Sequence, residues 1–320
     1  MSNAVPVDHS GRTPIRMLVA ANPSPMTGDG TNCFVIGAEA LAVIDPGPAD
    51  PAHLEAIVAE VAGRPVFGVF VTHSHLDHSP GAGPLAERLG APVLGFGDHA
   101  AGRSDTMRTL AEEAGAAAGL GGGEGADWSF KPDETLADGA AHMAPGGAWR
   151  LVALHTPGHT SNHLSFALEE AEGGDRAETE AGVWRSRALF CGDHVMAWST
   201  SIVSPPDGDM GAYMASLAKL AAREDPLYLP AHGPAIADPR ARLEELTTHR
   251  RGREAAVLSA LEQAPETAAG LAKAIYTDLD PRLLPLAERN VLAHLIDLWE
   301  QGRCAPEGGQ IRADARFRVG

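Results

Sequence analysis

The stretch Thr72-His73-Ser74-His75-Leu76-Asp77-His78 places four metal-binding side chains within six residues, His73 to His78. It directly follows an apolar run, residues 66–71, that predicts a buried strand. Imidazole nitrogens and carboxylates are the ligands that hold a catalytic divalent metal such as zinc. A helical zinc site would need two histidines at i and i+4 with a glutamate base, whereas the spacing here suits a loop. The sequence therefore predicts a metal site at the end of a strand.

The chain has 320 residues, enough to bury a large core in one domain or in a large domain plus a small one. Its apolar content is ordinary, and no stretch approaches the roughly 20 apolar residues that span a bilayer. The first residues show no signal peptide, and the three cysteines form no CxxC pair. These features predict a cytoplasmic protein that has no disulfides and does not contact a membrane.

Charge is unevenly distributed along the chain. Residues 240–320 contain 12 Lys or Arg and 12 Asp or Glu, so the net charge of −17 lies entirely in residues 1–239. An acidic surface repels phosphodiester backbones, so general binding of nucleic acid is not expected. An RNA substrate stays open as an alternative.

Apolar patterns and turn residues predict strands and helices in mixed order up to about residue 239. Strands are expected at residues 15–21, 33–36, 41–44, 66–71, 92–96, 149–154, 163–168, 188–191 and 227–229, and helices at 50–62 and 84–89. The stretch 100–148 is expected to be partly helical, and the acidic stretch 169–187 to be a solvated loop. This mixture suits two sheets that pack face to face with helices outside.

The pattern changes from residue 239 onward. A long helix is expected to about residue 263, followed by shorter helices at 267–276 and 283–301 and a strand pair within 310–319. Three helices and a β ribbon describe a small winged-helix-like domain. The predicted domains are therefore residues 1–239 and 240–320.

Three further predicted strands each end in a side chain that can bind a metal. They lead into His159 in TPGHT, Asp193 in FCGDH and His232 in AHG. The separations along the chain are 81 residues from His78 to His159, 34 from His159 to Asp193 and 39 from Asp193 to His232. One such strand end is weak evidence, but four of them in sequence predict a single metal centre.

With THSHLDH, TPGHT, FCGDH and AHG in this order, residues 15–239 resemble the metallo-β-lactamase superfamily. The resemblance implies an α/β fold, a four-layer αββα sandwich with a dinuclear metal site. It implies one metal bound by His73, His75 and His159, a second bound by Asp77, His78 and His232, and Asp193 as the bridge. His75 favours a hydrolase over the flavodiiron oxygen reductases, which have glutamate there. Asp45 matches an early aspartate of the superfamily that orients a ligand histidine, with an Asx turn before Pro46 as the alternative.

Residues 192–217 and the winged-helix-like domain narrow the resemblance to the β-lactamase-like-protein-2 group. This group includes an RNA-cleaving hydrolase and fungal thioesterases that release polyketides. The appended domain separates the chain from glyoxalase II, whose C-terminal helices bind glutathione through basic residues. The basic cluster Arg250-Arg251-Gly252-Arg253 is expected to be a solvated helix face or an interdomain salt bridge; a phosphate site is the alternative.

Several residues beside the predicted ligands are candidates for catalysis. Asp77 and Asp193 are expected to take part as ligands of the catalytic metals. His194 could protonate the leaving group or make a structural hydrogen bond, and Tyr213 could polarise a substrate oxygen or pack in a helix. Supporting or packing roles are expected for His155, His163, Cys191 and Trp184.

The predicted function is a metal-dependent hydrolase with two divalent ions, zinc being expected and manganese or iron the alternatives. A bridging hydroxide would cleave a thioester, lactone or ester of a small acyl substrate. Trp198, Met196 and Met210 are expected to frame that substrate. The alternatives are a phosphodiesterase or endoribonuclease acting on single-stranded RNA, and a non-catalytic binding protein with a vestigial metal site. The C-terminal domain is expected to roof the cleft or to form a homodimer.

Overall fold

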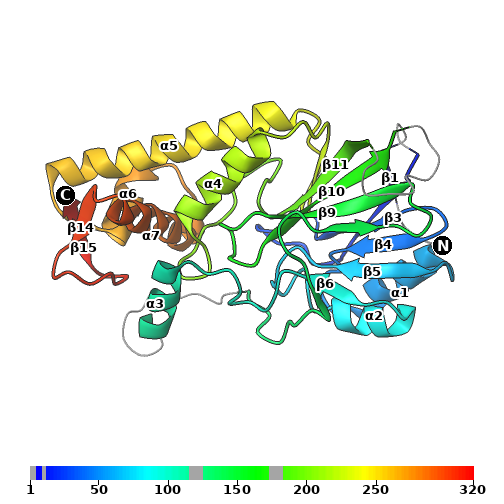
Figure 1. Ribbon diagram of the computed structural model, residues 1–320. Helices are drawn as coiled ribbons and strands as arrows, with labels where there is room; N and C mark the ends of the chain where they lie inside the picture. Colours follow the sequence, from blue (N-terminus) through cyan, green and yellow to red (C-terminus); the bar gives the residue numbers. More distant parts are fainter. Residues whose placement is uncertain (1–4, 9–11, 115–124, 173–182) are drawn as a thin grey trace.

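The computed structural model describes residues 5–8, 12–114, 125–172 and 183–320. Two sheets pack face to face in the larger part of the chain (Figure 1). The seven-stranded sheet runs in the order β1 (Val5–Asp8), β2 (Ile15–Val19), β3 (Asn32–Ile36), β4 (Leu41–Ile44), β5 (Val66–Phe70), β6 (Val93–Gly95) and β7 (Glu134–Thr135). The five-stranded sheet runs in the order β12 (Tyr228–Pro230), β11 (Trp184–Gly192), β10 (Leu164–Ala171), β9 (Trp149–His155) and β8 (Ala141–Met143).

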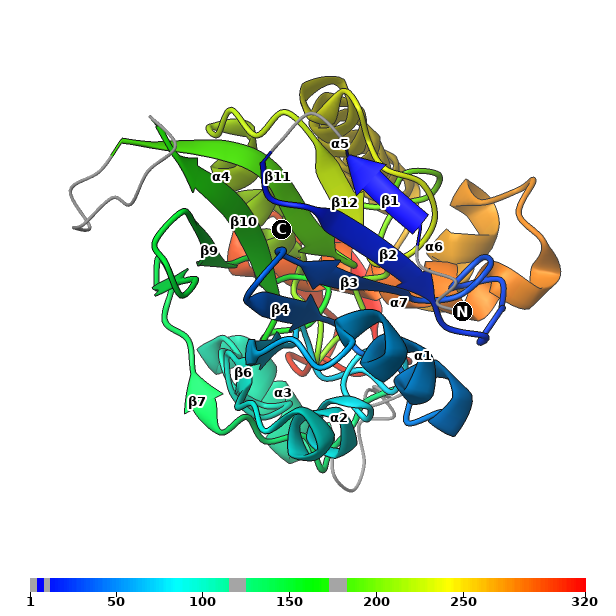
Figure 2. The same ribbon diagram turned by 90° about the vertical axis from the view of Figure 1, so that its right-hand side faces the viewer.

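Helices cover both outer faces of the sheet pair (Figure 2). On the seven-stranded sheet, α1 (Pro51–Val61) and α2 (Ala82–Leu89) bury Leu54, Ile57 and Leu85. On the five-stranded sheet, α4 (Met210–Ala221) and the first half of α5 (Pro239–Gln263) bury Leu217 and Leu243. Between the sheets lies a core with Phe34, Phe70, Phe166 and Phe190. These layers confirm the predicted αββα sandwich.

Parallel pairing delivers the motif loops to one edge of the sandwich. In the first sheet β4 pairs parallel with β5, so Asp45 and the loop at residues 72–78 leave the sheet side by side. In the second sheet β11 pairs parallel with β12, which brings together the turns that carry Asp193 and His232. β3 and β4 are buried along their whole length, which explains why they appear in the sequence as continuous apolar runs.

The C-terminal part forms a second core. Its elements are α6 (Ala268–Ile275), the 3₁₀ helix η1 (Pro281–Leu283), α7 (Leu284–Glu300) and a sheet in the order β13 (Glu266–Thr267), β15 (Arg316–Val319) and β14 (Cys304–Pro306). They enclose Leu271, Leu295 and Phe317, and the second half of α5 adds Val257. The predicted winged-helix-like domain is confirmed. Figure 1 shows α5 running from the sandwich to this domain, so one helix contributes to both cores.

Two predicted elements differ in the structure. The ends of the expected loop 169–187 belong to β10 and β11, where Glu169 and Glu170 pair with Arg150 and Arg187 on neighbouring strands. Opposite charges across a ladder make these acidic positions compatible with a strand; residues 173–182 lie outside the described part. The strand pair expected within 310–319 is instead β14 with β15. Ile311 packs into the core from the connecting loop, which accounts for its apolar character.

The stretch 100–148 contributes α3 (Asp105–Ala114) and the short strands β7 and β8. Met107 and Leu110 of α3 pack into the C-terminal core, so the larger domain also contacts it through this helix. Among the described residues, we find no helix that is both long enough and apolar enough to cross a membrane. The three cysteines are buried and unpaired, and burial raises the pKa of each thiol, so they are poor nucleophiles.

His294 of α7 is buried near Arg250, His249 and Arg253 of α5. Within the part of the chain that is described, neither of its ring nitrogens makes a hydrogen bond. Burial, and then the nearby charges of Arg250, His249 and Arg253, lower the pKa of His294 to about 3. The unfolded chain binds a proton here below about pH 6.5, whereas the folded chain does so only near pH 3. The stabilising effect of a neutral His294 is therefore lost as the pH falls.

We expect His294→Leu to weaken the acid sensitivity of the protein. Between about pH 3 and pH 6.5, unfolding of the wild type takes up a proton at His294, and the variant lacks this uptake. The slope of unfolding free energy against pH should therefore be lower in the variant by up to about 1.4 kcal/mol per pH unit. Urea unfolding of both proteins across this range measures the slope, and the other histidines cancel in the comparison. Equal slopes would contradict the prediction.

Candidate metal centre

The seven predicted ligands lie together at one edge of the sandwich, on loops that follow β5, β9, β11 and β12. They form two neighbouring groups: His73, His75, His159 and Asp193, and Asp77, His78 and His232. Within each group, the possible ligand atoms all lie within 4.8 Å of one another. The chain therefore has a cluster of histidines and aspartates able to bind metal, while the role of each ligand stays a prediction.

The first group converges on one point. His75 Nδ1 lies 3.0 Å from His73 Nε2 and 3.2 Å from His159 Nε2. Asp193 Oδ2 lies 3.6 Å from His159 Nε2. Ligands bound to one tetrahedral zinc at about 2.0–2.1 Å would lie roughly 3.3 Å apart. The observed spacing fits three neutral imidazoles and one carboxylate around a single ion.

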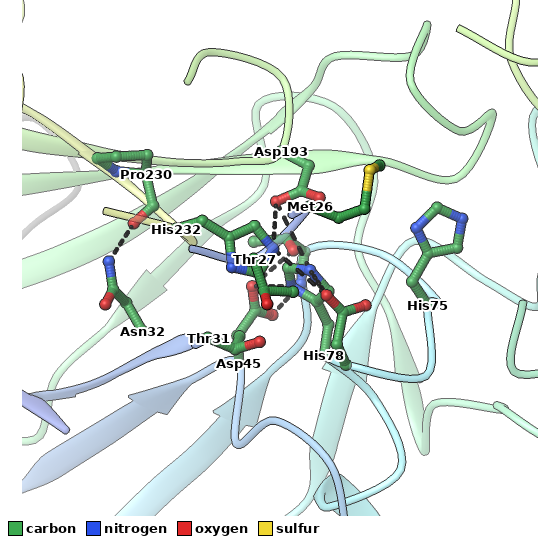
Figure 3. Close-up of polar contacts among 12 residues, drawn as sticks. Met26, Thr27, Thr31, Asn32, Asp45, His75, His78, Asp193, Pro230 and His232 are labelled. Atoms are coloured by element: carbon green, nitrogen blue, oxygen red, sulfur yellow. Dashed lines mark hydrogen bonds and ion pairs between the residues drawn. The ribbon is translucent and has the colours of Figure 1, made fainter. Parts of the chain in front are cut away.

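The second group faces the other oxygen of the same carboxylate. Asp193 Oδ1 lies 3.3 Å from His232 Nε2 and 3.6 Å from His78 Nε2, and Asp77 Oδ2 lies at the same two distances. Figure 3 shows Asp193 beside His78 and His232, with His75 apart from them. Asp193 Oδ1 and His78 Nε2 are buried without a hydrogen bond to any described residue, which suits metal ligands. The two oxygens of Asp193 thus face different groups.

Hydrogen bonds on the outer side fix the tautomers of the ligand histidines. His159 Nδ1 lies 2.6 Å from the carbonyl oxygen of Ile202, and His232 Nδ1 lies 3.1 Å from that of Gly30. A carbonyl only accepts, so each Nδ1 carries the proton and each Nε2 offers its lone pair to the cluster. Such outer partners orient the ligands of a metal and raise their basicity.

Asp45 holds one histidine of each group. Its carboxylate accepts hydrogen bonds from the Thr72 backbone N–H at 2.8 Å, the Thr72 hydroxyl at 2.7 Å and His78 Nδ1 at 3.0 Å. Because Thr72 Oγ1 donates to Asp45, it accepts from His73 Nδ1, 3.0 Å away. Asp45 has a positive φ of 48°, a conformation that aspartate tolerates better than most residues. These contacts fit the orienting role expected for Asp45.

The charges of the cluster are coupled. Burial alone would raise the pKa of Asp193, but His232 and His78 lower it well below its usual value. Burial opposes the charged form of His232 as well, yet Asp193 and Asp77 raise its pKa to about 10. Protons on these histidines balance the carboxylates in the free protein. Metal binding must displace them, so affinity should increase with pH.

Two supporting histidines lie where we expected them. His163 is buried, with Nε2 accepting from the Asp193 N–H at 3.2 Å and Nδ1 beside Thr156 Oγ1 at 2.9 Å. A Cβ atom on Gly192 would lie 2.5 Å from His163 Nε2, so only glycine permits this contact. His155 Nε2 donates to the Ser161 carbonyl at 2.9 Å and supports the loop that carries His159.

His194 does not join the cluster. It is fully buried, its ring lies 4.6 Å from that of Tyr213, and neither ring nitrogen has a hydrogen bond among the described residues. It therefore fits neither the proton donor nor the structural hydrogen bond considered from the sequence. The reason is local: Asp193 and His194 are successive residues in a turn and point to different sides. Tyr213 is buried too, with its hydroxyl donating to the His194 carbonyl.

The expected frame of the substrate is only partly correct. Met196 and Met210 are 6% and 1% exposed and belong to the protein interior. Trp198 is 45% exposed and lies over Gly233, where a Cβ atom would come within 2.1 Å of its ring. Leu76, between ligands His75 and Asp77, is 53% exposed. Met26, which Figure 3 shows near Asp193, is also exposed, so three apolar side chains border the ligands.

Sequence reasoning missed the groups that hold the ligand loops. Asn32 Nδ2 donates to the carbonyls of Pro230 and Gly233 at 3.0 and 2.9 Å, tying β3 to the turn of His232 (Figure 3). The sequence could have indicated Asn32, because it is a polar residue at the start of an apolar strand. It could not have indicated the Gly30 and Ile202 carbonyls, because every residue has a backbone carbonyl.

Comparison with known proteins agrees with this geometry. Residues 26–171 match the metallo-beta-lactamase superfamily, and residues 267–312 match the beta-lactamase associated winged helix domain. The chain thus carries a metallo-beta-lactamase domain followed by that winged helix domain. This confirms the predicted resemblance and a hydrolase of this fold.

Individual relatives cover most of the chain. The "Beta-lactamase-like protein 2 homolog" of Drosophila melanogaster is 28% identical over 298 residues, 89% of this chain and 88% of that protein. The "Atrochrysone carboxyl ACP thioesterase" of Aspergillus chevalieri is 27% identical over 79% of this chain and 67% of its own length. Several fungal relatives are matched over about two thirds of their length. A beta-lactamase domain protein from Burkholderia ambifaria has a crystal structure with TM-score 0.72, 25% identity, and coverage of 96% and 91%.

We expect Asp45→Asn to weaken metal binding at both groups. An amide nitrogen facing Thr72 Oγ1 and His78 Nδ1 cannot accept their protons, so His78 would lose its tautomer. Loss of such a partner typically reduces affinity about 10- to 100-fold. Chelator competition measures the affinity, and Asp133→Asn, at a carboxylate that accepts from the Val93 N–H at 2.8 Å, serves as the control. Unchanged affinity would exclude an orienting role for Asp45.

Proposed function

We propose that this chain is a dinuclear zinc hydrolase that cleaves thioesters, or related esters and lactones, of apolar acyl groups. The observation that supports it best is the carboxylate of Asp193, whose two oxygens face two separate groups of ligands. His73, His75 and His159 would hold one ion, and Asp77, His78 and His232 the other. When bound, the metals supply a water with a pKa near 7 and stabilise the negative charge that develops on the carbonyl oxygen.

The protein contributes binding, orientation and charge. Five neutral imidazoles and two carboxylates suit zinc, and the outer hydrogen bonds keep the imidazoles in the required tautomers. Asp77, whose pKa neighbouring histidines lower to about 2 against the opposing effect of burial, stays ionised in the working pH range. Trp198, Leu76 and Met26 offer an apolar border that can hold an acyl group and exclude water from the reacting bond.

A carbonyl substrate fits the charges better than a phosphodiester. The net charge of −17 opposes RNA binding at a distance. In the basic cluster, Arg250 is 1% exposed, and Arg253 stacks on Tyr276 at 4.3 Å. Neither arginine presents a free cation to a phosphate, which leaves the exposed Arg251 as the single arginine of this cluster that could do so. The thioesterase relative from Aspergillus chevalieri supports the same choice of substrate class. A cytoplasmic location and a homodimer remain predictions.

The central test is thiol release from a series of acyl-coenzyme A thioesters by the zinc-loaded protein. We expect turnover that is lost in Asp193→Ala, together with most of the metal at both groups, because the shared ligand is gone. Asp133→Asn should keep both. Metal content by mass spectrometry accompanies each assay.

Each outcome has a separate meaning. An active Asp193→Ala protein with two ions would overturn the assignment of the centre. A wild-type protein that holds two ions but releases no thiol would reject thioesters, and lactones and single-stranded RNA would be tested next.

We expect the apolar border to select for the acyl chain. Trp198→Ala should raise KM for a long-chain thioester about tenfold, the equivalent of about 1.4 kcal/mol of lost apolar contact, and should change KM for an acetyl thioester little. Trp184→Ala, at the far end of β11, is a matched control. Equal effects on both chain lengths would place the acyl group elsewhere.

A further inference from the structure

Residues 201–203 lie between the metal cluster and the winged helix domain. On the cluster side, the Ile202 carbonyl accepts from Nδ1 of His159 at 2.6 Å. The Ser201 hydroxyl hydrogen-bonds to the backbone carbonyl of Asp193 and lies 2.9 Å from that of His194. This short segment therefore contacts the His159 ring and the backbone of Asp193 at the same time.

The long helix α5 and helix α7 of the winged helix domain hold the same segment from behind. Arg250 of α5 donates through Nη2 to the Ser201 carbonyl and through Nη1 to Asn290 Oδ1 at 3.0 Å. Asn290 of α7 accepts from the Val203 N–H at 3.1 Å through the same oxygen, and its amide group donates to the Leu286 carbonyl at 3.1 Å. Two helices of the C-terminal domain thus fix both ends of the segment.

Burying the Arg250 guanidinium costs free energy. Arg250 is 1% exposed, and its partners among the described residues are a carbonyl, an amide oxygen and the Tyr213 ring at 5.0 Å, with no carboxylate. A buried guanidinium without a counter-ion is destabilising relative to an apolar residue of similar size. Domain packing alone would be served better by leucine or methionine. Arginine is the better residue here if the site requires directional hydrogen bonds to residues 201–203, because an apolar side chain cannot donate them.

We propose that the winged helix domain positions the metal ligands, with Arg250 and Asn290 as positioning residues that act through residues 201–203 on His159 and Asp193. This role differs from roofing a cleft or joining two subunits, because it acts from behind the ligands. The proposal rests on the metal-binding roles proposed above for His159 and Asp193. It makes the affinity and geometry of the metal centre depend on side chains of the second domain.

Arg242 provides a matched control on the same helix. Its guanidinium donates to the carbonyls of Met196 and Ser199 at 2.8 and 2.5 Å, in the same loop but outside residues 201–203. Arg242→Met therefore removes a comparable interdomain contact without releasing the segment that holds the two ligands. Its effect on thermal stability reports the structural value of such a contact.

The test measures metal binding directly, by cobalt titration followed through visible absorption and by chelator competition. We expect Arg250→Met and Asn290→Leu to lower affinity about 10- to 100-fold and to change the cobalt spectrum. Arg250→Lys, which keeps the positive charge and one donating nitrogen, should retain part of the affinity that Arg250→Met loses. Arg242→Met should leave both readouts near those of the wild type.

A coupling measurement separates positioning from general stability. Ser201→Ala breaks the link to Asp193, so the losses of Arg250→Met and Ser201→Ala should be less than additive in the double variant. If Arg250→Met does not fold, Asn290→Leu and Arg250→Lys carry the test. Lower melting temperatures with unchanged cobalt spectra and affinities would overturn the proposal. A wild-type protein that binds fewer than two ions would instead reject the dinuclear centre itself.

Discussion

The structure depends on placing one carboxylate, Asp193, between two sets of imidazoles. Its backbone is fixed by two contacts: His163, whose close approach Gly192 allows, accepts the Asp193 N–H, and the Ser201 hydroxyl donates to the Asp193 carbonyl. These contacts leave the side-chain oxygens free to face the two groups. Buried carboxylates and imidazoles cost free energy unless each faces a correctly placed partner, so the surrounding fold must hold this residue in position.

The orientation of the ligands follows a common rule. The histidines that use Nε2 toward the cluster have Nδ1 occupied by an acceptor, namely Asp45, Thr72, Gly30 or Ile202. His75 is different, since its Nδ1 faces the other ligands. Two of the acceptors are backbone carbonyls and are set by the fold itself. Neither carbonyl belongs to a side chain, so each depends on the contacts that hold the backbone at Gly30 and Ile202 in place.

The residues of the cluster were predictable because they follow four apolar strands, where side-chain chemistry and position are both visible in the sequence. Their division between two metals came from the family resemblance and stays a prediction. The fold followed from the same strands. His194 and Met196 were misplaced because the turn after β11 decides which side chains face the cluster, and no periodic pattern describes a turn. Met210 opens α4 and lies on the buried face of that helix. Arg250 did leave a signal: it lies two turns from both Leu243 and Val257, on the buried stripe of α5.

The long helix α5 has a consequence for how the protein unfolds. Leu243 and Leu246 at one end belong to the sandwich, while Val257 and Leu261 at the other belong to the C-terminal core. Neither core can come apart without exposing a stretch of the same helix. Unfolding of the two domains is therefore coupled through α5. A fluctuation that frees one end of α5 raises the local opening rate of the other end. Amide exchange along the helix reports on both cores together.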